Sequence, residues 1–163
     1  MRRIIMWILT IALMGFIFYM SAQDADTSGK HSSSVGWRVA CILHSDFEEW
    51  PLEKQIEYVE RIDHPVRKVA HGLEYMLLGM LLTGAIMPVD TTLISIKTGI
   101  KGISFAKPLC IGVAYAISDE VHQRFVPGRS CQFTDVCIDS GGVLAGVIAA
   151  FILFYIVYMI KNK

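Results

Sequence analysis

The chain has 163 residues, with 15 Lys and Arg against 15 Asp and Glu, so it lacks the basic excess that would indicate a nucleic-acid partner. Hydrophobic residues make up 53% of the chain, a fraction that many soluble domains share, so composition alone does not separate soluble from membrane proteins. The four cysteines show no CxxC spacing, so they do not indicate a metal site. A disulfide between Cys131 and Cys137 remains an alternative.

The apolar residues are gathered in long blocks, and this distribution indicates the class of protein. A helix needs about 20 mostly apolar residues to cross a bilayer. Four blocks approach that length, at about residues 4–20, 66–89, 103–122 and 134–160. We therefore expect a single all-α domain over residues 1–163, an integral membrane bundle of four transmembrane helices.

Lysine and arginine in short loops mark the cytoplasmic side of a membrane protein. They lie before the first block, between the second and third, and after the fourth, at Arg2, Arg3, Lys97, Lys101, Lys161 and Lys163. We expect a multi-pass protein of the cell membrane with both termini in the cytoplasm. The basic start of the first block also resembles a signal peptide, but its apolar run is long enough to span, which favours an uncleaved helix.

The first external loop, residues 21–65, is too long for a simple connection. Its polar part, residues 24–34, is expected to be irregular. Apolar residues at helical spacing in residues 35–43 indicate one short helix, and Pro51 suits the first turn of a second, which Pro65 ends. The second helix has an apolar and an acidic face, which fits both a helix on the membrane surface and a solvated one.

The last block contains Gly142 and Gly146, four residues apart. Small residues at this spacing let two membrane helices approach closely. We expect the pair to pack against another helix of the same chain rather than to form a dimer. The oligomeric state does not follow from the sequence.

Ionisable residues extend into the outer ends of three of the blocks. A span of about 20 residues, at about 1.5 Å per residue, is counted from the cytoplasmic end of each block. On this count the ionisable groups of the three blocks lie at a similar depth in the membrane. A charge at mid-bilayer costs on the order of 3 kcal/mol and less near the interface, so such groups should face one another, water or a ligand. Helical spacing predicts a cluster of Arg67, His71, Glu74, Asp119, His122 and Asp139.

The cluster offers two kinds of chemistry. Candidates for acid–base catalysis are His71, Glu74, Asp119, Glu120, His122 and Asp139. Candidates for binding a ligand or anion are Arg67, Lys68, Arg129, Gln123, Ser21 and Gln23. A tight turn at Pro127–Gly128 places Arg129 beside the carboxylates, where it can pair with them instead of an external anion. Neither an HExxH pattern nor a GxSxG elbow occurs, and we predict no metal and no cofactor.

Four motifs of this chain resemble those of the VanZ-like family of bacterial membrane proteins. They are Tyr19-Met20-Ser21-Ala22-Gln23, Arg67-Lys68-x-x-His71-x-x-Glu74-Tyr75, Asp119-Glu120-x-His122-Gln123-x-Phe125-x-Pro127-Gly128-Arg129, and Asp135-x-x-x-Asp139-x-x-Gly142. The matches extend from about Met1 to Ile160. One departure is Asp139-Ser140, where many members carry Asn close by. The resemblance implies a membrane protein whose family namesake is linked to low-level resistance to teicoplanin.

Three functions are compatible with these observations. In the first, an envelope protein binds a lipid head group or a lipid-linked wall precursor in its outward-facing cluster and affects glycopeptide susceptibility. In the second, a membrane-embedded enzyme acts on a lipid-linked substrate through the His, Glu and Asp side chains. In the third, the cluster only holds the helices together. The expected partners are membrane lipids and a wall precursor; the sequence names neither the ligand nor a reaction.

Overall fold

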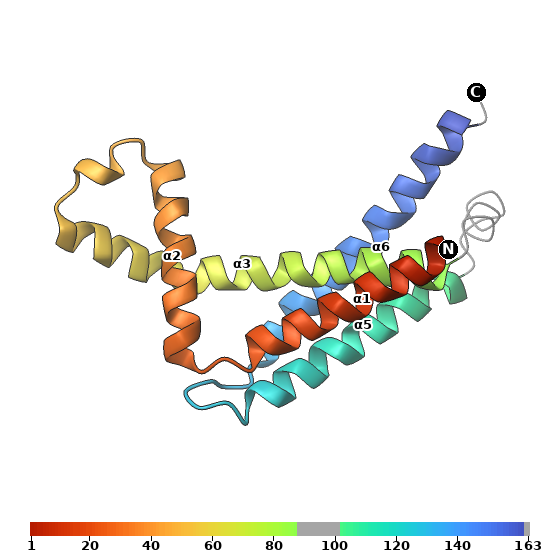
Figure 1. Ribbon diagram of the computed structural model, residues 1–163, viewed down its shortest axis with the longest axis horizontal. Coiled ribbons are helices and arrows are strands. Elements are labelled where there is room, and N and C mark those ends of the chain that lie inside the picture. The colour runs from red at the N-terminus through yellow and green to blue at the C-terminus, as the bar shows by residue number, and fades with distance from the viewer. Residues whose placement is uncertain (88–101, 162–163) are drawn as a thin grey trace.

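In the computed structural model, which describes residues 1–87 and 102–161, all regular structure is helical. The elements in chain order are α1 (Arg2–Ser21), α2 (Ala25–Leu43), the 3-10 helix η1 (Phe47–Glu49), α3 (Leu52–Ile86), α5 (Gly102–Gln123) and α6 (Phe133–Lys161). The long helices α1, α5 and α6 run beside the later part of α3, whereas α2 runs across α3 (Figure 1). The predicted cytoplasmic residues Lys97, Lys101 and Lys163 lie outside the described residues.

Three of the described helices are long and apolar enough to cross a membrane: Arg2–Ser21, Leu52–Ile86 and Phe133–Ile160. These correspond to the first, second and fourth predicted spans. The third, α5, is not among them; it carries Lys107 near its start and Asp119 and Glu120 near its end. It nevertheless packs against α3 and α6 in the same bundle.

The closest packing in the bundle is between α3 and α6, and it depends on glycine. A Cβ atom at Gly146 would overlap the carbonyl oxygen of Met76, and one at Gly142 would overlap that of Gly72. The two backbones therefore touch where α6 has no side chain. This confirms the prediction that the glycine pair packs within the chain.

The core of the bundle forms around α3, which contacts α1, α2, α5 and α6. Its fully or nearly buried apolar residues are Ile17, Tyr75, Leu78, Leu82, Met87, Ala116, Val143, Val147 and Phe151. Hydroxyl groups inside the bundle bond to carbonyl oxygens: Thr83 to Gly79 at 2.8 Å, and Tyr115 to Met14 at 2.6 Å. Such bonds are needed because a membrane interior offers no water to hydroxyl groups.

The prediction that Pro65 ends a helix was wrong, because α3 continues through it as one helix of 35 residues. Proline removes one backbone hydrogen bond and crowds the preceding turn, which normally ends or kinks a helix. Here Pro65 is exposed, so water can solvate the carbonyl that it leaves free. One i, i+4 ion pair precedes Pro65, Arg61 with Glu57, and another spans it, Arg67 with Asp63; both favour the helix there.

The prediction of an irregular segment at residues 24–34 was also wrong, because α2 begins at Ala25. The side chain of Asp24 accepts a hydrogen bond of 2.7 Å from the backbone N–H of Thr27 and so caps the helix. Ser32 and Ser33 donate their hydroxyl groups to backbone carbonyls one turn earlier, as serine does in a helix interior. A polar composition was therefore a poor sign of irregular structure in this segment.

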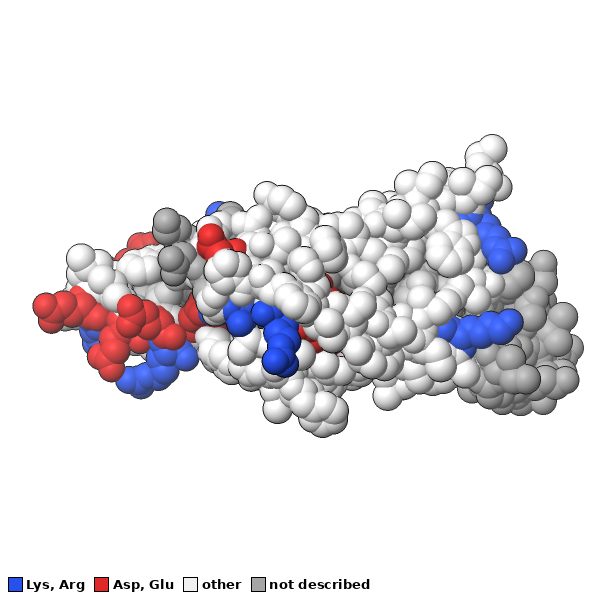
Figure 2. Space-filling view, turned by 90° about the horizontal axis from the view of Figure 1, so that it is seen from below, with Lys and Arg blue, Asp and Glu red and all other residues white. Residues whose placement is uncertain are grey.

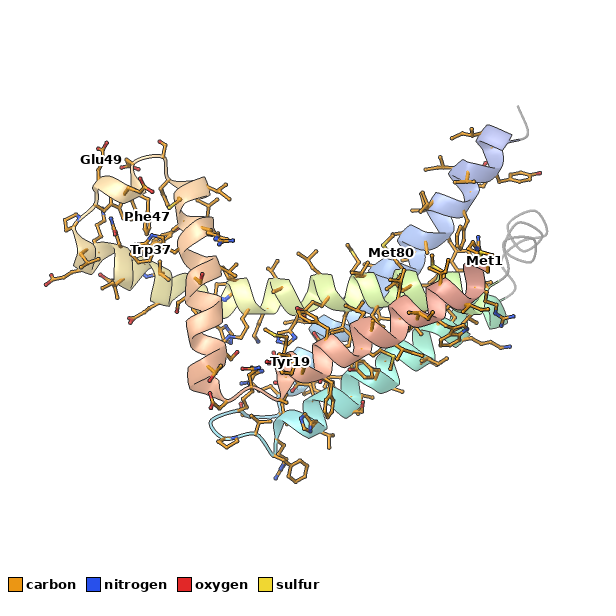
Figure 3. The ribbon with its side chains drawn as sticks, viewed as in Figure 1. Met1, Tyr19, Trp37, Phe47, Glu49 and Met80 are labelled. Carbon is orange, nitrogen blue, oxygen red and sulfur yellow. The ribbon has the colours of Figure 1, made fainter. Side chains whose placement is uncertain are left out.

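The end of α2, η1 and the start of α3 form a small aromatic lobe outside the bundle (Figure 1). Trp37 and the fully buried Phe47 face one another between α2 and α3, with ring centroids 5.4 Å apart (Figure 3). The side-chain N–H groups of the buried Gln55 bond to the carbonyl oxygens of Phe47 and Trp50, at 2.9 and 3.0 Å. The apolar face of the second predicted loop helix thus packs partly against α2, through Val59.

The glycine contact yields the first prediction. Gly146→Ala should lower the free energy of unfolding by about 1–3 kcal/mol, because the new methyl group forces α6 away from the backbone of α3. Gly141→Ala is the matched control, since a Cβ there meets nothing within 4 Å. Thermal unfolding of both variants in detergent checks this; equal stability of the two would contradict it.

Candidate functional site

Charged side chains gather at one end of the molecule, and a wide uncharged band separates them from lysines and arginines at the other end (Figure 2). At the crowded end, α3 leaves the bundle, α5 ends and α6 begins (Figure 1). The spacing of Arg67, His71 and Glu74 along α3 brings them to one face of that helix. Asp119 comes from the last turns of α5, and Asp139 from the second turn of α6.

The loop between α5 and α6 is fixed by a tight turn. The N–H of Arg129 bonds to the carbonyl of Val126 at 3.1 Å, across Pro127 and Gly128. Gly128 has φ = 74°, a conformation that favours glycine at the third position of this turn. The predicted Pro-Gly turn is confirmed, and it directs Arg129 back toward the bundle.

The guanidinium of Arg129 reaches across the end of the bundle. It donates to the side-chain oxygen of Gln123 at 3.3 Å and to the backbone carbonyl of Met20 at 3.4 Å. Burial lowers the pKa of Arg129, and the nearby Arg67 lowers it further, whereas carboxylates in the surroundings raise it. Two positive groups therefore lie close enough to repel one another.

A buried hydrogen-bond network joins the ends of α1 and α5. Ser21, which is fully buried, donates to a carboxylate oxygen of Asp119 at 2.8 Å. The amide of Gln123 donates to the same oxygen at 3.2 Å and to the Ser21 hydroxyl at 3.4 Å. Asp119 is only 1% exposed, so these donors replace the water that its carboxylate has lost.

Other carboxylates at this end have partners of their own. Lys68 on α3 forms an ion pair of 2.7 Å with Asp135 on α6. Glu120 accepts a hydrogen bond of 3.2 Å from the backbone N–H of Gln132. Arg67 is paired with Asp63, one turn earlier on α3. The Lys68–Asp135 pair therefore connects α3 to α6, and the Glu120–Gln132 bond connects α5 to the loop.

A polar cavity of about 140 Å³ lies between α3, the α5–α6 loop and the start of α6. It is lined by His64, Arg67, Lys68, His71, Glu120, Gln123, Gly128, Arg129, Ser130, Gln132, Asp135, Ile138 and Asp139. One water needs about 10–15 Å³ measured in this way, so the polar cavity has room for several waters or for a small polar group.

Several buried polar atoms around the polar cavity have no hydrogen-bond partner among the described residues. They include Nε of Arg67, Nε of Arg129, Nδ1 of His71 and Oδ1 of Asp139. Nδ1 of His71 lies 3.8 Å from a carboxylate oxygen of Glu74, which is too long for a hydrogen bond. An unpartnered buried polar atom costs free energy, so these atoms mark where a bound group or water would be stabilised.

A family model, VanZ/LLP1, matches residues 6–156. The chain belongs to the VanZ/LLP1 family. Its membership and its long apolar helices together make it a VanZ-like membrane protein. No curated protein and no solved structure matches the chain.

The VanZ-like structure brings together about half of the residues expected at the site. Those that line the polar cavity are Arg67, Lys68, His71, Glu120, Gln123, Arg129 and Asp139. Asp119 lies behind them in the network with Ser21. Glu74 is directed past His71 and borders a second hollow beside α2.

Two expected residues lie elsewhere. The ring of His122 stacks on that of Phe18, with centroids 4.2 Å apart, on the side of α5 that faces α1. Gln23 lies between α1 and α2 and is not part of the polar cavity lining. Within the described part of the chain, no group of three or more His, Cys, Asp or Glu side chains is placed to hold a metal ion.

The sequence did not single out four lining residues: His64, Ser130, Gln132 and Ile138. His64 continues the face of Lys68 and His71 by one helical turn, and this spacing could have revealed it. It was missed because α3 was expected to end at Pro65. Ser130 and Gln132 carry no motif and reach the cavity through the path of the loop, whereas Ile138 lies on α6 three residues after Asp135.

Proposed function

We propose that this VanZ-like membrane protein binds the anionic head group of a membrane lipid, or of a lipid-linked wall precursor, in the polar cavity. The observation that carries the proposal is the pair of arginines, Arg67 and Arg129, which both line the polar cavity. A guanidinium presents donors in a planar fork that matches phosphate and carboxylate oxygens.

The contacts of Arg129 favour an anion beside it. Arg67 and Lys68 have carboxylate partners, whereas the hydrogen bonds of Arg129 to described residues go to neutral acceptors, Gln123 and Met20. An anion bridging Arg67 and Arg129 would remove their mutual repulsion. Asp139 also lines the polar cavity, and its carboxylate can accept a hydrogen bond from a hydroxyl group of the same head group.

The alternative in which the polar side chains only hold the helices together explains part of the site. The Lys68–Asp135 pair and the Ser21–Asp119 bond do connect different helices. It does not explain a polar cavity whose arginines keep unused donors. The two alternatives differ in what an arginine substitution changes, either the binding of a ligand or the stability of the fold.

We also propose that the chain crosses the membrane four times, with α5 as the third span and the polar cavity outside. α5 lies beside α6 over most of its length (Figure 1) and has about 33 Å of helix, enough to cross the hydrocarbon. Arg2, Arg3 and Lys107 lie at the end of the bundle opposite the cavity. The tendency of Lys and Arg to remain in the cytoplasm then places both termini there.

The second prediction concerns binding. Arg67→Gln and Arg129→Gln should each weaken the binding of short-chain phosphatidic acid about ten-fold or more, because a charge-assisted hydrogen bond is lost. The measurement is a titration of detergent-purified protein, with zwitterionic phosphatidylcholine of the same chain length as the reference lipid. Arg61→Gln is the matched control, since Arg61 is on the same helix but pairs with Glu57 in solvent.

Thermal unfolding of the same variants separates binding from structure. Unchanged affinity with a lowered unfolding temperature would support the structural alternative and overturn the binding proposal.

The third prediction concerns glycopeptides. If occupation of the polar cavity protects a wall precursor, expression of the chain in a susceptible bacterium should raise the inhibitory concentration of teicoplanin, and the Arg67→Gln variant should not. An unchanged inhibitory concentration on expression of the wild-type chain would contradict the role in glycopeptide susceptibility. It would not contradict the binding of lipid.

The fourth prediction concerns topology. In a variant with Cys131 as its single cysteine, a membrane-impermeant maleimide should label the protein in intact spheroplasts, since Cys131 is exposed in the α5–α6 loop. A single cysteine added after Lys163 should be labelled only after the membrane is permeabilised. Labelling of the added cysteine from outside would contradict the proposed topology.

A further inference from the structure

A second hollow of about 180 Å³ lies beside the polar cavity, between the end of α1, α2 and α3. Its lining includes the apolar side chains of Met20, Val35, Val66 and Ala70. Tyr19, labelled in Figure 3, marks the end of α1 that borders it. We call it the apolar hollow.

The apolar hollow and the polar cavity share a wall. Arg67, His71 and Arg129 line both of them. Two of these side chains are arginines, so positive charge lies at the boundary between a polar and an apolar space. A ligand that suits both spaces needs an anionic group with an apolar chain attached close to it.

We infer that the ligand is a chain-bearing phosphate amphiphile, whose phosphate lies between Arg67 and Arg129 and whose chain lies in the apolar hollow against α2 and α3. This rests on the head-group binding proposed above and adds the class of ligand. The polar cavity alone would suit a soluble anion equally well. The apolar hollow favours a lipid, because a soluble anion would leave the apolar wall exposed to water, whereas an attached chain covers it.

The position of α2 is consistent with this occupant. α2 starts near the end of α1 and runs across α3 (Figure 1), and its residues Ser28, Ser32 and Val35 form one wall of the apolar hollow. Val35 remains 49% exposed, which leaves apolar surface for a chain to cover. The wall on α3 is formed by Val66 and Ala70, one turn apart.

The test compares inorganic phosphate, glycerol phosphate and phosphatidic acids of increasing chain length, each titrated against the purified full chain in detergent. Wild-type protein should bind the phosphatidic acids more tightly than the two soluble phosphates. Ala70→Phe fills the apolar hollow, so it should weaken phosphatidic acid binding about ten-fold or more. Its binding of inorganic phosphate should stay unchanged. Val69→Phe is the matched control, since Val69 is 62% exposed on another face of α3.

Val35→Trp fills the apolar hollow from α2 and provides a second variant should Ala70→Phe fail to fold. Equal affinity of the wild-type protein for soluble and chain-bearing phosphates would overturn the inference. The inference would also be overturned if Ala70→Phe and Val35→Trp both bound phosphatidic acid as tightly as the wild-type protein does. Failure of the head-group proposal would look different. In that case Arg67→Gln would bind every one of the phosphates with the same affinity as the wild-type protein.

Discussion

Contact between the backbones of α3 and α6 determines the geometry of the whole bundle. Gly142 and Gly146 on α6, with Gly79 on α3, remove the side chains that would otherwise separate the two helices. In a membrane, apolar side chains gain little by leaving lipid for protein, so close packing has to supply the association. The contact also fixes the register at which Asp135 and Asp139 on α6 face Lys68 and His71 on α3.

Much of the fold could be predicted from the sequence, because long apolar blocks have few alternatives in a membrane protein. The ends of α1, α5 and α6 lie within two residues of the predicted ones. The errors lie outside the membrane, at Pro65 and at residues 24–34, where local rules on proline and on polar composition were applied alone. Ion pairs around Pro65 and a capping side chain at Asp24 favour the helices there, and these are local side-chain contacts that composition does not show.

The candidate site could be predicted in part, for a similar reason. Helical spacing groups Arg67, His71 and Glu74 on one face; Arg67 and His71 do line the polar cavity, together with the neighbouring Lys68, whereas Glu74 lines the second hollow. Spacing says less about how one helix is rotated against another, so it could not show that His122 faces Phe18 rather than the cavity. The division of the polar residues into a buried Ser21–Asp119 network and an open cavity also depends on packing between helices.

The unbroken length of α3 has a mechanical consequence. At 35 residues the helix is about 52 Å long, against about 30 Å of hydrocarbon, so roughly two fifths of it would extend beyond the hydrocarbon. That outer part carries Tyr58, Val59 and Ile62 of the aromatic lobe, and no loop separates it from Arg67. Pro65 lies between the lobe and Arg67 and removes one backbone hydrogen bond, so a tilt of the lobe would bend the helix there before it moved the cavity wall.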